Sequence, residues 1–444
     1  MRALAALVLL AAGCARFDPW GELSALPPGP GPERPPAAPG LRGRTLSVAD
    51  CLAIGLERNP RTRAAWLASK AAAARLGEEK APYLPAVDAV AGLSRTDTPE
   101  LRDGRESPED ELRAGLVVRQ TLYDGSREAR VRGSEAELRA ASFLHHAALH
   151  DAALEIELAF AERLAARALV GVAEGALRSA EAHADLARAR QAAGVAARFD
   201  VLKAQTERAD AELALVRARS DARVAQGRLC RAMGLRASEE FEVEEPPSAG
   251  AEEAVAVQAL LEEALRGRPE MRAAAERIES RRADVALADS GHLPVVSAGA
   301  EYGWADREFG ELRREWTAGI GVTLPLFSGF GPSYRGGRAR AELARAEAER
   351  EALARDVELE AWTAHARLAE ARDAVEAARR LVEAAEEGAR AAEGRYRAGT
   401  GSIIELADSL RDRTAARARL VRAELDRSSA RVRLERALGR RPAR

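Results

Sequence analysis

The sequence RYRAGTGSIIELAD, residues 395–408, lies between two long runs that are rich in Ala, Arg, Glu and Leu. Gly399 supplies backbone freedom where the first run ends as a helix, and Ser402 is a favourable N-cap for the helix that follows. Glu405 and Asp408 would share one face of that second helix, where the positive end of its dipole favours carboxylates. The stretch therefore predicts the tip of a long helical hairpin.

A related tip, RQAAGVAARFDVLK, occupies residues 190–203. Gly234 follows its glycine, Gly194, at the same separation at which Gly439 follows Gly399. Each later glycine comes directly after a helical pattern, as a helix-ending glycine does. A fixed separation between matching features is typical of an internal duplication. The chain is therefore predicted to contain two copies of one unit.

The two copies begin with matching helical patterns. Leu46–Leu56 carries apolar residues at helical spacing, and Pro60 then starts a further helix. Pro60 and Pro85 are separated by as many residues as Pro269 and Pro294 of the second copy, so the copies are in register. The predicted segments are a first repeat at 45–235, a linker at 236–253 and a second repeat at 254–440.

After these helical segments the hydrophobic pattern changes to strict alternation. Apolar residues alternate with small or polar ones, so we expect four strands in two hairpins, each strand with one apolar face. The expected strands are about 86–94, 111–122, 295–304 and 315–326. Tyr302, Trp304 and Trp316 have the positions of an aromatic girdle at a membrane interface. Two hairpins packed on a soluble core are the alternative interpretation.

A strand of about ten residues, tilted by about 45°, would cross the roughly 25 Å hydrocarbon band of an outer membrane. Four strands cannot close a barrel, because the smallest known barrels have about eight. A membrane barrel therefore requires several copies of the chain, and three copies would supply twelve strands. The sequence has no apolar run of about 18 residues or more, so no transmembrane helix is expected.

Each second strand leads into a helical pattern of roughly 60 to 65 residues, or roughly 95 Å of helix. Shorter return helices are expected at about 197–232 and 402–438. The apolar stripe of the long helices must be buried by neighbouring helices. The predicted fold class is therefore mainly α, with duplicated long-helix hairpins and four strands per protomer.

The composition excludes several classes of protein. With 68 basic and 70 acidic residues interspersed along the helices, no basic surface indicates nucleic-acid binding. Neither a Gly-rich phosphate loop nor a local Ser/His/Asp signature is present, so we expect no enzyme activity and no cofactor. His145, His146 and His150 include an i, i+4 pair, but no acidic motif completes a metal site, and a helix surface is their expected role. Cys51 and Cys230 are expected as buried free thiols, with a disulfide as the alternative.

The amino terminus has the pattern of an export signal. A charged start precedes a short apolar run that ends in LAAGC, residues 10–14, which is similar to the lipobox of bacterial lipoproteins. It implies a signal peptide at 1–13, a covalent lipid on Cys14 and, because Ala15 rather than Asp follows, delivery to the outer membrane. Residues 14–44 are rich in Pro and Gly and are expected to form an extended tether. An ordinary signal peptide with a chance cysteine is the alternative.

Over about residues 46–440 the chain resembles the TolC family of outer-membrane efflux proteins. The resemblance depends on the duplication, on tips of the form Arg-Tyr-x-x-Gly followed by Ser-x-x-acid, and on two pairs of matching motifs. These motifs are YLP at 83–85 with HLP at 292–294, and QTLYDG at 120–125 with LPLFSG at 324–329. The lipobox is similar to that of the family's lipoprotein branch.

The resemblance implies a homotrimer with a twelve-stranded barrel in the outer membrane and a long α-helical tunnel in the periplasm. Members of the family are exit ducts for inner-membrane pumps of the RND, ABC or MFS type, joined through a periplasmic adaptor. The implied function is passive export of small molecules, metals, drugs or polypeptides, in tripartite efflux or type I secretion. No motif in the sequence indicates the substrate or the pump.

The resemblance also assigns functional residues to the two tips. Glu405 and Asp408 correspond to carboxylate rings that narrow the inner end of the tunnel, where three copies of each would concentrate cations. Asp200 and Tyr396 match positions that tie neighbouring helices closed in some members. Lys203 stands at the first-copy position equivalent to Asp408 and would partly neutralise the ring.

The tip glycines Gly194 and Gly399 belong to the same gating region. A basic residue that takes part in the closing ties of some members is absent, because Gly401 occupies its place, so a weaker closed state is expected. The simpler interpretation is that Glu405 and Asp408 only favour the start of a helix.

Two other classes of function share some of these features. A periplasmic adaptor or structural coiled-coil lipoprotein would also have a lipobox and a helical hairpin, but an adaptor has one hairpin flanked by β-barrel domains. An enzyme on a helical scaffold would need a convergent polar cluster. The two consecutive helix–strand–helix units of this chain favour the outer-membrane duct over both.

Overall fold

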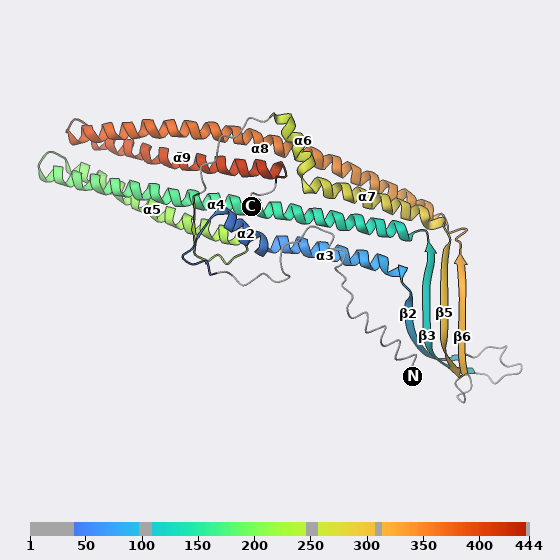
Figure 1. Ribbon diagram of the computed structural model, residues 1–444. Helices are drawn as coiled ribbons and strands as arrows, with labels where there is room; N and C mark the ends of the chain where they lie inside the picture. Colours follow the sequence, from blue (N-terminus) through green and yellow to red (C-terminus); the bar gives the residue numbers. More distant parts are fainter. Residues whose placement is uncertain (1–39, 97–108, 246–255, 307–312, 441–444) are drawn as a thin grey trace. The chain divides into compact units, whose positions relative to one another are not determined.

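The computed structural model describes residues 40–96, 109–245, 256–306 and 313–440. The expected signal peptide, Cys14 and most of the tether lie outside the described residues. The first copy contains α2 (Val48–Arg58), α3 (Pro60–Lys80), β2 (Ala86–Thr96), β3 (Glu109–Asp124), α4 (Arg127–Ala192) and α5 (Arg198–Ala232). The second contains α6 (Val257–Gly267), α7 (Pro269–Asp289), β5 (Val295–Asp306), β6 (Arg313–Thr323), α8 (Gly331–Arg397) and α9 (Ile403–Ala437). The same series thus occurs twice, which confirms the duplicated fold (Figure 1).

The described chain divides into two compact units. One contains residues 67–143 and 272–351, and the other contains residues 40–66, 144–271 and 352–440. All strands longer than two residues lie in the first unit, and both hairpin tips lie in the second.

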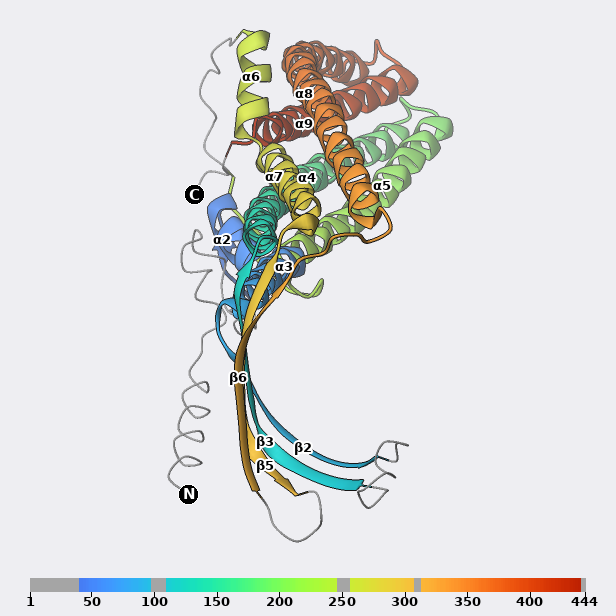
Figure 2. The ribbon, with the colours of Figure 1, turned by 90° about the vertical axis from the view of Figure 1, so that its right-hand side faces the viewer.

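Strands β2, β3, β5 and β6 form one antiparallel sheet in that order. The two expected hairpins are present, and the pairing of β3 with β5 joins them, a contact that the alternation had not predicted. Figure 2 shows that the strands bend along their length. The register aligns the predicted apolar faces, because Leu116 lies opposite Tyr302 and Tyr302 lies opposite Trp316. The rings of Tyr302 and Trp304 meet edge to face, with centroids 5.8 Å apart.

The last strand is shorter than expected. The alternation predicts a strand to residue 326, whereas β6 ends at Thr323. Thr323 already pairs with Val295, the first residue of β5, and Pro325 has no amide hydrogen to donate to a ladder. The apolar residues that follow are exposed and belong to the connection with α8.

The long helices have the expected lengths, with 66 residues in α4 and 67 in α8. The return helices α5 and α9 have 35 residues each. In Figure 1 the α4–α5 and α8–α9 hairpins lie side by side with both tips at the same end. Within the described residues, no helix combines the length and the apolar character that a membrane span needs.

Glycine positions the end of the return helix in both copies. Gly234 has a φ of 70° and packs on the junction of α2 and α3, where an added Cβ would lie 2.8 Å from the carbonyl oxygen of Arg58. Gly439 has a φ of 69° and packs on the junction of α6 and α7, where an added Cβ would lie 2.6 Å from the carbonyl carbon of Gly267. Since only glycine fits such positions, the repeated glycines mark a repeated contact between helices.

Two short strands pair with each other where the sequence predicts the start of a helix and a linker. Leu46 lies in β1 (Thr45–Leu46), which pairs in parallel with β4 (Glu242–Val243). The expected helix start at Leu46 is therefore wrong, and α2 begins at Val48. Its N-cap is Ser47, whose side chain and backbone form a capping box with Asp50.

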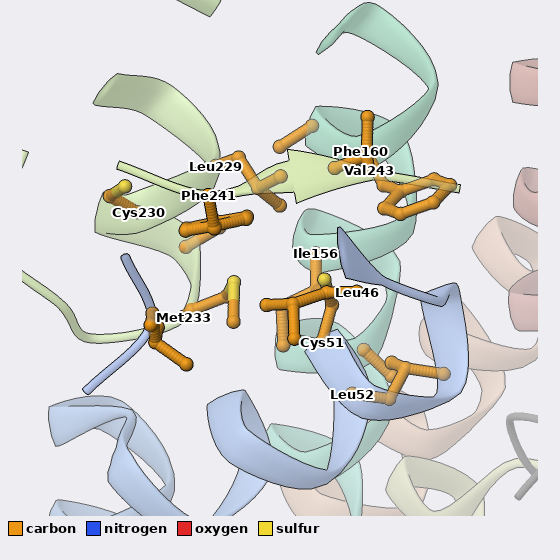
Figure 3. Close-up of a cluster of buried hydrophobic side chains, with 14 residues drawn as sticks. Leu46, Cys51, Leu52, Ile156, Phe160, Leu229, Cys230, Met233, Phe241 and Val243 are labelled. Carbon is orange, nitrogen blue, oxygen red and sulfur yellow. The ribbon is translucent and has the colours of Figure 1, made fainter. Parts of the chain in front are cut away.

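Figure 3 shows the core around these strands, in which side chains from α2, α4, α5 and β4 point toward one another. Leu41 is 1% exposed in this core, although the tether was expected to extend to residue 44. Burial of one leucine stabilises by about 1.5–3 kcal/mol, which is a physical reason for Leu41 to pack in this core. Cys51 and Cys230 are both buried here as free thiols, as expected. Burial raises the pKa of the Cys51 thiol to about 12.

Candidate functional site at the hairpin tips

Both long helices end in the same backbone turn. In each tip, the glycine and the residue after it donate hydrogen bonds back to the last helical turn. These bonds run from Gly194 to Gln191 (2.9 Å), Val195 to Arg190 (3.0 Å), Gly399 to Tyr396 (3.1 Å) and Thr400 to Arg395 (2.9 Å). The pattern is a Schellman motif, which requires a positive φ at the glycine. The φ angle is 76° at Gly194 and 80° at Gly399.

The return helices begin differently. Ser402 is the N-cap of α9, and its hydroxyl accepts a hydrogen bond of 3.1 Å from the N–H of Glu405. Ala197 is the N-cap of α5 and offers no side-chain acceptor. At Gly401, an added Cβ would lie 3.0 Å from the Cβ of Arg395. This crowding is a physical reason for glycine at the position where the resemblance implies a basic residue.

The two tips pack against each other within one chain. Their cluster of buried side chains contains Ala184, Ala187, Val201 and Ala204 from the first hairpin, with Ala392, Tyr396, Ile403 and Leu406 from the second. Alanines at the contact let the helices approach closely. Tyr396, which is 2% exposed, is the largest member of the cluster.

An arginine of the first hairpin holds Tyr396. The Arg190 guanidinium carbon lies 4.8 Å from the centroid of the Tyr396 ring, and Arg190 Nη1 donates a hydrogen bond to the Tyr396 carbonyl. The Tyr396 hydroxyl is buried and makes no hydrogen bond within the described chain. Burial raises the pKa of this hydroxyl, and the charge of Asp200 raises it further. The Tyr396 hydroxyl therefore makes no hydrogen bond to Asp200 within the described chain. A contact between these two residues in an assembled trimer stays a prediction.

Glu405 and Asp408 lie on the first turns of α9, partly exposed, and each has an arginine beside it. Glu405 Oε1 is 3.4 Å from Arg395 Nη1, and Asp408 Oδ1 is 3.0 Å from Arg411 Nη1. Ion pairs this exposed stabilise by about 0–1 kcal/mol and are screened by salt. Both carboxylates therefore remain available to cations in solution.

Within one chain, the charge of Asp408 is offset by Arg411 and not by Lys203. Lys203 Nζ lies 2.8 Å from Glu207 on its own helix. Arg411 reaches across from α9 to the same Glu207 with two hydrogen bonds of 3.1 and 3.2 Å. Burial opposes ionisation of Glu207, but the hydrogen bonds from Arg411 and Lys203 lower its pKa below the ordinary value.

The sequence pattern did not indicate the two cross-hairpin arginines. Arg411 follows Asp408 by three residues, a spacing that indicates an ion pair within α9 but not the contact of Arg411 with Glu207. Arg190 and Tyr396 are 206 residues apart, and no local spacing could indicate their contact.

One face of α5 carries large apolar side chains that the described chain leaves exposed. They recur at helical spacing as Phe199, Leu202, Leu213, Val216 and Val224. Phe199 is 59% exposed and Val216 is 60% exposed. Such a stripe is larger than the single apolar residues that are scattered over an ordinary protein surface.

The rings of His145 and His146 lie close together, with centroids 6.0 Å apart. His145 is 4% exposed and lies against Trp66, with ring centroids 5.8 Å apart, so the helix surface expected for it is wrong. Burial lowers the pKa of His145 to about 4. Burial and the charge of Arg436 also lower the pKa of His150. No group of three or more His, Cys, Asp or Glu residues in the described ranges is arranged to hold a metal ion.

Comparisons with known proteins agree with this architecture. The family model of the outer membrane efflux protein matches the chain twice, at residues 54–235 and 260–440. The chain is 29% identical over 381 residues to protein CyaE of Bordetella pertussis, which covers 85% of this chain and 80% of CyaE.

Solved structures share the fold. The outer-membrane channel OprN is similar with a TM-score of 0.78 and 22% identity, over 93% of this chain and 98% of OprN. The CmeC outer membrane channel of Campylobacter jejuni has a TM-score of 0.77 and 17% identity, over 88% of this chain and 85% of CmeC.

The family model matches both repeats and so favours an outer-membrane channel over the alternative of a periplasmic adaptor. The chain belongs to the outer membrane efflux protein family.

Proposed function

We propose that three copies of the chain assemble into one export duct, with a twelve-stranded barrel in the outer membrane and a helical tunnel that narrows at the hairpin tips. The observation that carries this proposal is the open sheet. In the order β2-β3-β5-β6, the outer edges of β2 and β6 have no partner strand within the described chain. Backbone groups inside a bilayer must be paired, so β6 of one copy would pair with β2 of the next until the ring closes.

The exposed apolar side chains of the helices support the same assembly. The stripe on α5 and the exposed Leu359 and Trp362 on α8 would be covered by helices of neighbouring copies. Each large side chain buried in this way contributes about 1.5–3 kcal/mol. Strand pairing and helix packing would therefore be completed by one and the same partner, a second copy of the chain.

At the inner end of the duct each copy would contribute Glu405 and Asp408. Six carboxylates around a narrow opening concentrate cations and hold back anions. Arg395 and Arg411 offset part of this charge in every copy. We therefore expect a moderate preference for cations, with Asp200, Lys203 and Tyr396 contributing to gating.

The tips would also meet the rest of the export machine. Val195 of the first tip and Ile404 of the second are exposed apolar side chains, which suit contact with a periplasmic adaptor. The adaptor would connect the duct to an inner-membrane pump, which supplies the energy. The duct itself would need neither catalysis nor a cofactor.

The assembly is tested by purifying the lipid-bearing protein from outer-membrane fractions in mild detergent. Light scattering should give about three times the mass of the processed chain, the mass of a closed twelve-stranded ring. The same material should form ion-conducting channels in planar bilayers. A compact monomer would contradict the proposal.

The proposed lipid anchor has its own test. Cells that express the wild-type chain should incorporate labelled fatty acid into it, and Cys14→Ser should abolish the label. Because Cys14 precedes both repeats in the sequence, the variant should still form trimers. Label that persists in Cys14→Ser would rule out Cys14 as the acylated residue.

A further inference from the structure

The end of α4 reaches into the neighbouring hairpin through one side chain. Arg190 lies in the last turn of α4, and its own carbonyl accepts the N–H of Val195 in the first tip. Its guanidinium lies over the Tyr396 ring and donates to the Tyr396 carbonyl in the last turn of α8. A cation at this place complements the negative end of the α8 dipole. Arg190 therefore belongs to the first tip by its backbone and to the second tip by its side chain.

The position of this guanidinium is tightly defined. An added Cβ at Gly399 would lie 3.5 Å from Arg190 Nη2, so the side chain also lies beside the turn of the second tip. Arg190 Nε is buried and makes no hydrogen bond within the described residues. Burial of an unpaired donor costs free energy, and the contacts with Tyr396 must offset that cost. Arg190 is thus held against α8 and not directed to solvent.

Arg411 makes a second cross-hairpin contact in the opposite direction. Within one chain, it extends from α9 of the second repeat to Glu207 on α5 of the first repeat. Its side chain is about half exposed, so solvent screens this contact. The contact of Arg190 with a tyrosine that is 2% exposed is the better protected of the two.

We propose that Arg190 is a positioning residue that fastens the second tip to the first and thereby keeps the aperture narrow. Tyr396 shares its buried cluster with Ile403 and Leu406, which lie on the same first turns of α9 as Glu405 and Asp408. When Arg190 releases Tyr396, these turns lose the surface on which they rest. The carboxylates then move away from the axis. This inference depends on the proposed function, because it assigns a role to Arg190 only in the trimeric duct.

The test compares three variants of the full-length trimer in planar bilayers. Arg190→Ala should raise the ratio of open to closed channels by about fivefold per protomer, the factor expected for loss of one partly buried cation–π contact. Arg190→Lys keeps the charge but loses the planar stacking and should recover only part of the closed state. Arg188→Ala is the matched control, since Arg188 lies one half-turn away on α4 and pairs with Asp185 of the same helix. It should conduct like the wild type.

A second pair of variants keeps the test decisive if Arg190→Ala does not assemble. Tyr396→Phe preserves the ring under the guanidinium and removes only a hydroxyl that makes no hydrogen bond within the described chain, so it should open the channel much less than Tyr396→Leu. Tyr396→Leu preserves an apolar side chain but removes the ring and should open the channel as Arg190→Ala does.

The possible outcomes are distinct. Trimers of Arg190→Ala that conduct like those of Arg188→Ala would overturn the role of Arg190, as would equal opening by Tyr396→Phe and Tyr396→Leu. In both cases the wild type still forms channels and the duct proposal stands. A wild-type protein that forms no channel would instead overturn the proposed function, and this inference with it.

Discussion

The two hairpin tips share a backbone turn but differ in chemistry. Each long helix ends in a Schellman motif around a glycine with positive φ. Beyond the turn, the second tip presents Glu405 and Asp408, whereas the equivalent positions of the first tip hold Asp200 and Lys203. The return helix has a serine N-cap in the second tip and an alanine in the first. The two repeats thus share the backbone turn but differ in the charge of the residues that follow it.

Different residues therefore determine the backbone turn and the charge of each tip. The turn depends on glycine and on backbone hydrogen bonds, so its neighbours can change without loss of the hairpin. The buried tyrosine is also specific to one repeat. Gln191 has the position in the first tip that Tyr396 has in the second, and Gln191 is exposed. The second tip carries this tyrosine and the paired carboxylates, while the first supplies Arg190 and an apolar surface.

The largest effect is expected where the tips differ in burial. Tyr396→Ala removes a buried aromatic side chain and should destabilise the packed tips by about 3–5 kcal/mol. Gln191→Ala at the equivalent exposed position should change stability by about 0.5 kcal/mol or less. Hydrogen exchange of the tip amides measures both. Equal loss of protection in the two variants would show that the stabilising role of Tyr396 is not specific to the second repeat.

The next effect should be the same in both tips. Gly194→Ala and Gly399→Ala each force a side chain into the left-handed region and should each cost about 1–2 kcal/mol. The same exchange measurement applies, with Gly388→Ala on α8 as a control, because an added Cβ there meets no atom within 4 Å and its φ is not positive. A clear difference between Gly194→Ala and Gly399→Ala would contradict a shared turn.

A smaller effect should have opposite signs in the two tips. Ser402→Ala removes the N-cap of α9 and should destabilise its first turn by about 1 kcal/mol. Ala197→Ser should stabilise the first turn of α5 by a similar amount, about 1 kcal/mol, because the new hydroxyl can accept an N–H that now lacks a side-chain cap. Exchange rates of the first amides of each helix report both changes. The comparison fails if both substitutions act in the same direction.

The smallest effect concerns the contact between the return helices. The pKa of Glu207 is lowered in the folded chain, so its ion pairs stabilise above the ordinary carboxyl pKa of 4.5 and are lost as the pH falls through the folded value. Acidification should therefore loosen the contact with Arg411, by at most about 1 kcal/mol because both side chains are partly exposed. Channel opening measured at pH 7 and at successive pH values below 4.5 should differ less in Glu207→Gln than in the wild type. An unchanged pH response in Glu207→Gln would exclude this carboxylate as the cause.

Local features of the tips and long helices could be read from the sequence, whereas contacts across the fold could not. Gly399, Ser402 and the alternating strands act through neighbours in the chain, so spacing and residue type indicated them. The β1–β4 pair has two residues in each strand, too few for any periodicity. The β3–β5 pairing and the contact of Arg190 with Tyr396 join distant segments, and a single sequence holds no local signal for such contacts.

The charge difference between the tips is the claim on which the duct depends most. Block of single-channel current by divalent cations measures it directly, with the Glu405→Ala/Asp408→Ala double variant compared with the wild type. If these carboxylates surround the aperture, wild-type channels should be blocked and the double variant should be nearly insensitive. Block of equal strength in both proteins would show that the carboxylates of the second tip do not line the opening.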